Sequence, residues 1–323
     1  MRVAAAAAIA AVLAGCAPYA PAPSASDRAC ALRREFHAAP LPGVPPGDIA
    51  ALRRAGLSDD ATRTAEAIGA VGPIRIILGA ERAPERQTWF LIGRQALSER
   101  VLLSLLEVEA SVAALECDGT RAQALASRLD SIQSNRNSLI NAAGIAIGAV
   151  SGIASGVLGL ANAGTASDWV TITGGVGSGI TSTAAMLQTS TGHFLASSQM
   201  LEDVLRQPVH STAFPPRVWR FLTQRPQPGA PTPAEEVVAE WRGSGLIPAD
   251  GDEQATLAIL RAEGRLSSGD LDTRRMILDV LVARIALLHR NIRRLLDEVT
   301  GRPMPPALAA GPAWLRAEAA RGR

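Results

Sequence analysis

Apolar residues recur at steps of three and four along a stretch that begins after Arg94. This is the spacing of one face of an amphipathic helix, and in parts it is typical of a coiled-coil seam. The positions are Val101, Leu105, Val108, Val112, Leu115, Leu125, Leu129, Ile132 and Leu139. No proline occurs between Pro84 and Pro208. An unbroken helix from Leu97 to Asn162 would span about 100 Å at 1.5 Å per residue, which predicts an elongated molecule.

The second half of this stretch is rich in small residues. Asp168 and His193 are the only titratable side chains in residues 137–201. Glycines follow one another there at a strict spacing of four: Gly144, Gly148, Gly152 and Gly156. Each glycine in a helix interior costs about 1 kcal/mol relative to alanine, and residues four apart share a face. The stripe therefore favours close approach of another backbone, as in a glycine zipper.

A matching stripe follows a predicted turn near Thr165. Gly164 suits a helix end, and Ser167 or Asp168 suits the cap of a returning helix that runs from Trp169 toward Arg206. The returning arm offers small residues at the same spacing: Gly175, Gly179 and Thr183. Short connections make neighbouring helices antiparallel. We therefore predict a long helical hairpin over residues 84–207, with an uncharged tip over about 137–201.

The surroundings of this tip are open at the level of sequence. Residues Ala142 to Ala161 carry no charge and are long enough to cross hydrocarbon, but their many glycines and alanines make them only marginally apolar. The returning arm is more polar still. One interpretation buries the hairpin against protein. The other inserts it into lipid, an architecture that resembles the α-helical pore-forming proteins, with no residue correspondence.

The flanking regions predict further helices, so the expected fold class is all-α, an elongated bundle built on the hairpin. In residues 27–83 a helix capped by Ser58 should run through Ile68, while Ile74–Leu78 reads as strand-like. Residues 208–323 should pack on the hairpin base. Their expected helices are Val218–Gln224, Pro233–Trp241, Asp252–Glu263 and Arg274–Thr300, the last with heptad-like Ile277, Leu281, Ile285, Leu288, Ile292, Leu295 and Val299. Two arginine pairs, Arg274-Arg275 and Arg293-Arg294, are expected on its solvated face.

The N-terminus has the features of a secretory signal. Arg2 precedes an apolar run from Val3 to Leu13 that is too short to span a membrane. The residues Leu13-Ala14-Gly15-Cys16 resemble the lipobox of bacterial lipoproteins. The resemblance implies that residues 1–15 are removed and that Cys16 carries acyl chains, palmitate among them, which hold the protein on a membrane. It further implies an outer-membrane, periplasm-facing location, because Ala17 stands where aspartate would favour the inner membrane. Residues 16–26 read as a tether.

Two cysteines remain after Cys16, and their compartment permits disulfides. Cys30 and Cys117 are therefore candidates for a disulfide, with two buried free thiols as the alternative. The formal charge of +2 provides no field for nucleic acid, and aromatics at 3% provide no base-stacking surface. Lysine is absent, which excludes a P-loop lysine and a Schiff-base lysine.

No catalytic motif, metal site or cofactor site is predicted. The run GGVGSG, residues 174–179, follows no strand and has Ile180 where the dinucleotide fingerprint needs glycine, so it reads as helix packing. The histidines, His37, His193, His210 and His289, lack metal-ligand spacing. Acidic residues such as Glu107 and Glu109 are two apart on a helix and do not face each other.

The expected function is that of a lipid-anchored cell-envelope protein with a structural or protein-interaction role, in which the hairpin is the packing or contact element. Its expected partners are the membrane, through Cys16, and a second copy or another envelope protein. Neither nucleic acid nor a small-molecule substrate is expected. The alternative is a membrane-inserting or pore-forming component. An enzyme of unknown class comes third.

Overall fold

The structure is a computed structural model that describes residues 30, 41–81, 87–160, 190–196, 199–249, 252–262 and 264–302. Over these residues the protein is all-α with one short two-stranded sheet, which confirms the predicted fold class. The elements are α2 Pro46–Arg54, α3 Asp59–Ala67, α4 Val71–Glu81, α5 Gln87–Leu160, β1 Thr191–His193, α7 Met200–Arg206, α8 Pro216–Thr223, α9 Pro233–Gly243, α10 Glu253–Arg261, β2 Arg265–Ser267 and α11 Ser268–Thr300.

The chain divides into two compact units, each described by itself. One, the strand unit, contains the described residues of 124–195 and 263–271. The other, the helical unit, contains Cys30 together with the described residues of 41–123, 196–262 and 272–302.

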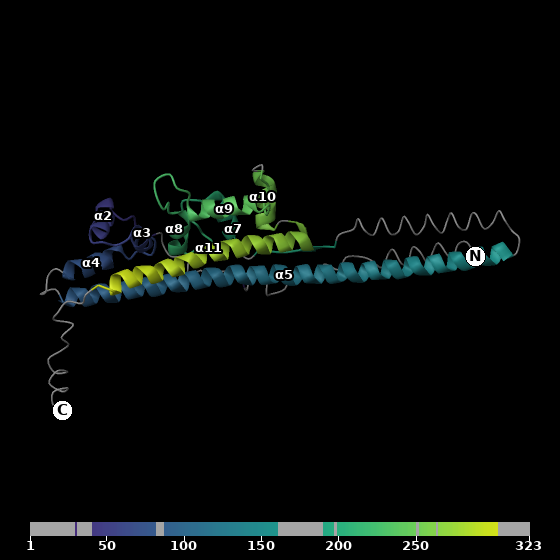
Figure 1. Cartoon of the computed structure of the whole chain (residues 1–323), viewed down its shortest axis with the longest axis horizontal. Coiled ribbons are helices and arrows are strands. Elements are labelled where there is room, and N and C mark those ends of the chain that lie inside the picture. Colours follow the sequence, from purple (N-terminus) through teal and green to yellow (C-terminus); the bar gives the residue numbers. More distant parts are fainter. Residues whose placement is uncertain are drawn as a thin grey trace, which may run out of the picture. The chain divides into compact units, whose positions relative to one another are not determined.

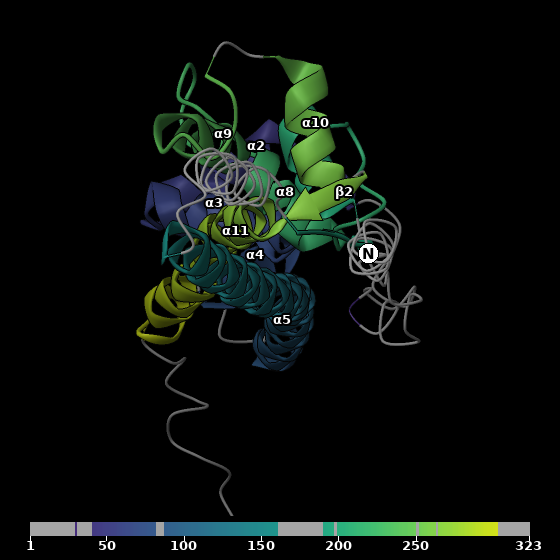
Figure 2. The same cartoon turned by 90° about the vertical axis from the view of Figure 1, so that its right-hand side faces the viewer.

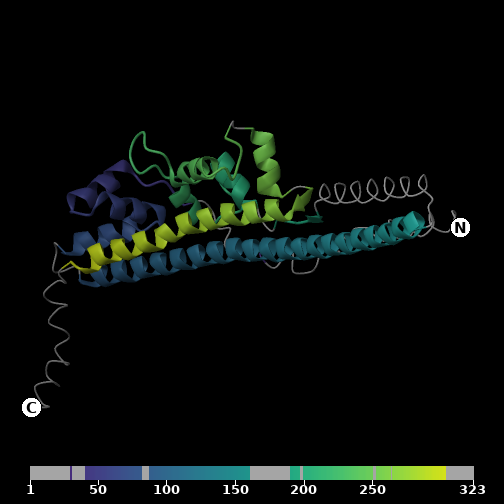
Figure 3. The same cartoon turned by 45° about the vertical axis from the view of Figure 1, so that its right-hand side comes forward.

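Within the helical unit, α11 lies along α5, and the helices α7 to α10 cover the opposite side of α11 (Figures 1 and 2). The same layering is visible from a third direction in Figure 3. The predicted heptad-like residues of α11, from Ile277 to Val299, are all buried. α11 also approaches α5 closely, because Leu278 Cδ1 would lie 3.8 Å from a Cβ placed on Gly119.

The buried face of α5 differs from the predicted seam in two ways. Ile132 and Leu139 were predicted to be buried, but both are exposed, Leu139 at 72%. Nearer the start of the helix, two residues with small polar side chains, Ser104 and Ser111, are completely buried. Each serine hydroxyl donates to the carbonyl four residues earlier, Ser104 Oγ to Arg100 O at 2.6 Å and Ser111 Oγ to Glu107 O at 2.8 Å. Because these bonds satisfy the hydroxyls locally, the serines can occupy an apolar face.

Two buried ion pairs connect α5 to other helices. Glu107 accepts hydrogen bonds from the Arg217 guanidinium and from the Arg217 backbone N–H, and Arg217 Nε donates to Ile68 O at 3.2 Å. Burial raises the pKa of Glu107 above its usual value, against the lowering effect of the Arg217 charge. In the second pair, Arg274 Nη2 donates to Asp118 Oδ2 at 2.8 Å. Each pair fixes α5 against a helix distant in sequence.

Arg274 corrects a prediction, because it was expected on the solvated face and is 1% exposed. Its Nη1 donates to Leu260 O at 2.7 Å and is 3.4 Å from Ile259 O, at the C-terminal end of α10. A fixed positive charge satisfies carbonyls that have no partner inside that helix. The neighbouring Arg275, and the pair Arg293-Arg294, are exposed as predicted.

Local signals explain several helix ends. Ser58 caps α3 as predicted, its Oγ accepting from Ala61 N at 3.1 Å. The same serine donates through its backbone N–H and its hydroxyl to the Glu298 carboxylate, at 3.0 and 2.6 Å, which fastens α3 to the end of α11. Thr232 and Glu235 form a capping box at the start of α9, with Pro233 in the first turn.

The segment Ile74–Leu78 is helical and not strand-like. It lies inside α4, where Ile74, Ile77 and Leu78 are buried on one face and Ile76 points outward. A run of β-branched residues favours a strand only when its alternate positions can be buried against a sheet. Here the core is made of helices, and α4 packs against α2 and α3.

In the strand unit, β1 pairs antiparallel with β2, with Gly192 opposite Leu266. The prediction of a helix from Trp169 to Arg206 is therefore wrong over Thr191–His193. A Cβ on Gly192 would lie 3.4 Å from Leu125 Cδ1, so the missing side chain leaves room for α5 to approach the strand. Ser190 is fixed to the same helix, because its N–H and hydroxyl donate to Gln133 Oε1 at 3.1 and 2.9 Å.

Candidate functional site

The predicted glycine stripe is carried by a continuous helix. Gly144, Gly148, Gly152 and Gly156 all lie within α5, which runs to Leu160. The matching residues Gly175, Gly179 and Thr183, and the turn near Thr165, lie outside the described residues. The hairpin pairing therefore stays a prediction. No helix among the described residues has a stretch that is both long enough and apolar enough to cross a membrane.

A disulfide joins the N-terminal part of the chain to α5. Cys30 and Cys117 are bonded, with their α-carbons 5.5 Å apart, and Cys30 is 3% exposed. The separation in sequence is 87 residues, so the bond closes a large loop. Cys16, the predicted site of lipid attachment, lies outside the described residues. The chain that leaves Cys30 toward Cys16 therefore starts from a fixed point on α5.

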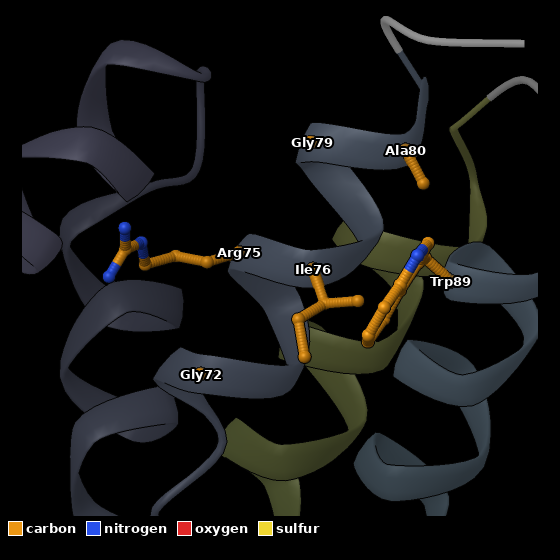
Figure 4. A pocket seen from close by; sticks show the side chains of 6 residues that line it. All are labelled: Gly72, Arg75, Ile76, Gly79, Ala80 and Trp89. Atoms are coloured by element: carbon orange, nitrogen blue, oxygen red, sulfur yellow. The ribbon is translucent and has the colours of Figure 1, made fainter. Parts of the chain in front are cut away.

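A groove lies between α4 and the first turns of α5, and we refer to it as the α4/α5 groove. It encloses about 630 Å³. Its lining residues, shown in Figure 4, are Gly72, Arg75, Ile76, Gly79, Ala80 and Trp89. Five of these residues come from α4, and the Trp89 ring stands opposite Ile76 and Ala80 as the far wall. The groove is thus built from two neighbouring helices of the helical unit.

The groove is neutral although it includes an arginine. Arg75 points away from Trp89 toward α2 in Figure 4, where its Nη1 pairs with Asp48 Oδ1 at 2.5 Å. The charge is therefore directed out of the groove. Two apolar side chains are exposed at the opening, Trp89 at 56% and Ile76 at 36%. Exposed aromatic and aliphatic side chains around a hollow mark an interaction surface more often than an accident of packing.

Close packing at Gly93 holds the two walls together. A Cβ at this position would lie 2.9 Å from Ile77 Cγ1 and 3.2 Å from the Ile77 backbone nitrogen. Only glycine permits this approach of α5 to α4 without a shift of the backbone. On the next turn back, Phe90 is buried and the Arg94 guanidinium lies 5.8 Å from its ring centroid. Trp89 is therefore presented by a rigid helix end.

The sequence analysis missed this groove. The strand-like interpretation of Ile74–Leu78 hid the fact that Gly72, Ile76 and Gly79 share one helical face. The sequence did contain a signal for it. Gly72 and Gly79 are seven residues apart with Ile76 between them, so in a helix they lie on one face where only Ile76 has a large side chain.

The titratable residues of the helical unit form ion pairs rather than a reactive cluster. Glu202 accepts from Arg261 Nε and Nη2 at 2.8 and 2.5 Å and from Arg206 Nη1 at 2.5 Å. The hydrogen bond from Arg261 lowers the pKa of Glu202 most, aided by the Arg206 charge and opposed by burial. Burial raises the pKa of the adjacent Asp203, despite the hydrogen bond from Ser211. These contacts join α7 to α10.

The described histidines are far from one another in the chain. His193 lies in β1, His210 precedes α8, and His289 Nδ1 is 3.6 Å from Glu109 Oε1 on the surface. Within the part of the chain that the structure describes, no group of three histidine, cysteine or acidic side chains could hold a metal ion.

Comparisons with known proteins add no family to this picture. The chain matches no protein-family model, and the searches against curated proteins and against solved structures give no match.

Proposed function

We propose that this protein is a lipid-anchored component of the bacterial cell envelope with a structural or protein-interaction role, in which the glycine-rich end of α5 is a contact element. Two features support the proposal. The residues Leu13-Ala14-Gly15-Cys16 provide the attachment site in the sequence. The Cys30–Cys117 disulfide gives the attached segment a fixed point on α5.

The disulfide is the observation that carries the proposal. Cys30 follows Cys16 by 14 residues. A fully extended chain spans at most about 3.5 Å per residue, so Cys117 would stay within about 50 Å of the lipid surface. A tether that ends in a covalent bond to a long helix limits the distance between that helix and the membrane. Such an arrangement suits a protein that presents α5 to a partner at a limited distance from the membrane.

A Cys16→Ser variant exported by an ordinary cleavable signal peptide tests this attachment. We expect the unaltered protein to fractionate with the outer membrane and to incorporate labelled palmitate. The variant should instead be released with the soluble periplasm, because a removed acyl group abolishes the anchor. The variant Cys30→Ser/Cys117→Ser is the control, since it lacks the disulfide but keeps the attachment site.

The outcome also separates the alternatives. Soluble Cys16→Ser protein supports anchoring through the acyl chains. Retention of that variant on membranes through high salt and alkaline carbonate would contradict the proposal and favour a membrane-inserting hairpin.

Replacing glycines of the stripe by leucine tests whether the stripe is packed, because the sign of the change in melting temperature differs between the two cases. Leucine is a better helix former than glycine by about 1 kcal/mol per position, so Gly148→Leu/Gly152→Leu should stabilise α5 if these positions face solvent. If they press against another backbone, as we propose, the bulky side chains should separate the two and lower the melting temperature. Thermal unfolding by circular dichroism measures the sign. The control is Gly243→Leu at the end of α9, where nothing lies within 4 Å of an added Cβ.

A further inference from the structure

The α4/α5 groove is open over its glycines. An added Cβ at Gly72 or at Gly79 would meet no heavy atom within 4 Å. Together with Ile76 and Trp89 these positions form a neutral hollow whose floor is backbone and whose wall is an indole ring. A hollow of this kind fits an apolar segment with side chains large enough to fill the space above each glycine.

The last described residue lies next to one end of this groove. Arg302 Nη2 donates to Ala55 O at 2.5 Å, and its Nη1 is 3.6 Å from Glu81 Oε2. Glu81 is the final residue of α4 and directly follows Ala80, which lines the groove. The Arg302 guanidinium therefore lies at the end of α4 that carries Ala80.

The 21 residues that follow Arg302 have the composition that the groove requires. Large apolar side chains occur at Met304, Leu308, Trp314 and Leu315, and the first charge is Arg316. Prolines at 303, 305, 306 and 312 disfavour a helix and favour an extended chain. From Ala80 back to Gly72 the face of α4 is about 12 Å long at 1.5 Å per residue. An extended chain at about 3.3 Å per residue covers this length within four residues, so every residue from Leu308 to Leu315 can reach it.

We propose that the α4/α5 groove is the docking site of the chain's own C-terminal segment, residues 303–323. Its uncharged part, up to Leu315, lies over Gly72 and Gly79 and covers Trp89. The end of α11 delivers the segment at the groove's edge, which makes the local concentration of this occupant far higher than that of any separate molecule. A partner protein that needs the groove must then displace the segment.

Hydroxyl-radical footprinting with mass spectrometry tests the proposal on the full chain. The rate of Trp89 oxidation is compared between the unaltered protein and Trp314→Ser/Leu315→Ser. We expect oxidation of Trp89 to be severalfold faster in the variant, because the polar side chains weaken docking and uncover the indole. The matched control, Arg321→Ser/Arg323→Ser, changes the same segment beyond its apolar part and should leave the rate unchanged.

A second variant approaches the contact from the other side. Gly79→Trp places an indole in the groove from a position where nothing lies within 4 Å of the added Cβ, and it should displace the segment. Trypsin should then cleave after Arg316 faster than in the unaltered protein or in Gly243→Trp. Equal Trp89 oxidation in all three footprinting samples would overturn the proposal. So would protection of Trp89 that is lost on dilution, which would identify a second copy as the occupant.

Discussion

Replacing Arg274 with methionine should lower the free energy of unfolding by about 3 kcal/mol, because removing one member of a buried ion pair leaves an uncompensated charge. The charge left behind is Asp118, which is buried, and the carbonyl groups of Leu260 and Ile259 lose their donor at the same time. Arg121 Nη1 lies 3.4 Å from Asp118 Oδ1, so the Asp118 charge stays partly compensated in the variant. The expected loss of stability is therefore at the lower end of the usual range for a broken buried ion pair. Urea unfolding followed by circular dichroism measures it.

The adjacent Arg275 provides the matched control. It is exposed, and its Nε is 3.9 Å from Asp279 Oδ2, so Arg275→Met should change stability by less than about 0.5 kcal/mol. The double variant Asp118→Leu/Arg274→Met removes both charges and should recover much of the loss. Equal denaturation midpoints for Arg274→Met and Arg275→Met would contradict the role assigned to this pair.

The same two arginines show how far the sequence can predict the fold. Helical periodicity locates α11, since the predicted heptad-like residues from Ile277 to Val299 occur at steps of three and four and are all buried. Periodicity treats all arginines as solvated, however, and burial of Arg274 depends on Asp118 and on the carbonyls of α10. The Arg274–Asp118 contact joins residues 156 apart in the chain, and the sequence around either residue does not predict it.

The candidate site depends on tertiary context for another reason. Gly93 and Gly79 look alike in sequence, yet one is packed against Ile77 and the other faces open space. The difference arises from which helix face meets a neighbour, and that became visible only when Ile74–Leu78 proved to be helical. The disulfide candidates Cys30 and Cys117 were identified from the sequence because only two cysteines remain after Cys16, and the structure shows them bonded.

Removing the disulfide should have the largest effect on stability. The bond closes a loop of 87 residues, and constraining a loop of that length in the unfolded chain is worth about 4.6 kcal/mol. The variant Cys30→Ser/Cys117→Ser should lose this amount in urea unfolding. The oxidised protein should lose a comparable amount when dithiothreitol is added. Dithiothreitol should not affect the double variant, and a variant as stable as the oxidised protein would show that the bond does not constrain the unfolded state.

The same variant should also lengthen the proposed tether. With the disulfide, Cys30 is the first described residue after Cys16 that is fixed to the helical unit. Without it, the next contacts among the described residues are at Leu41 and Pro42, whose carbonyl groups accept from Arg220 Nη2, the second at 3.0 Å. Twenty-five residues then separate Cys16 from Leu41, so the maximum reach from the lipid grows from about 50 Å to about 90 Å at 3.5 Å per residue.

Neutron reflectometry of the acylated protein on supported bilayers measures this change as the height of the protein layer. Oxidised protein should give a layer held close to the bilayer, and Cys30→Ser/Cys117→Ser should give a layer that extends farther and is less sharply bounded. Cys16→Ser protein, which should not attach, gives the background. Identical layer heights for the first two would mean that another contact, and not the disulfide, fixes the tether to the helical unit. A taller layer would show that one covalent bond sets both the stability of the fold and the distance at which α5 is presented from the membrane.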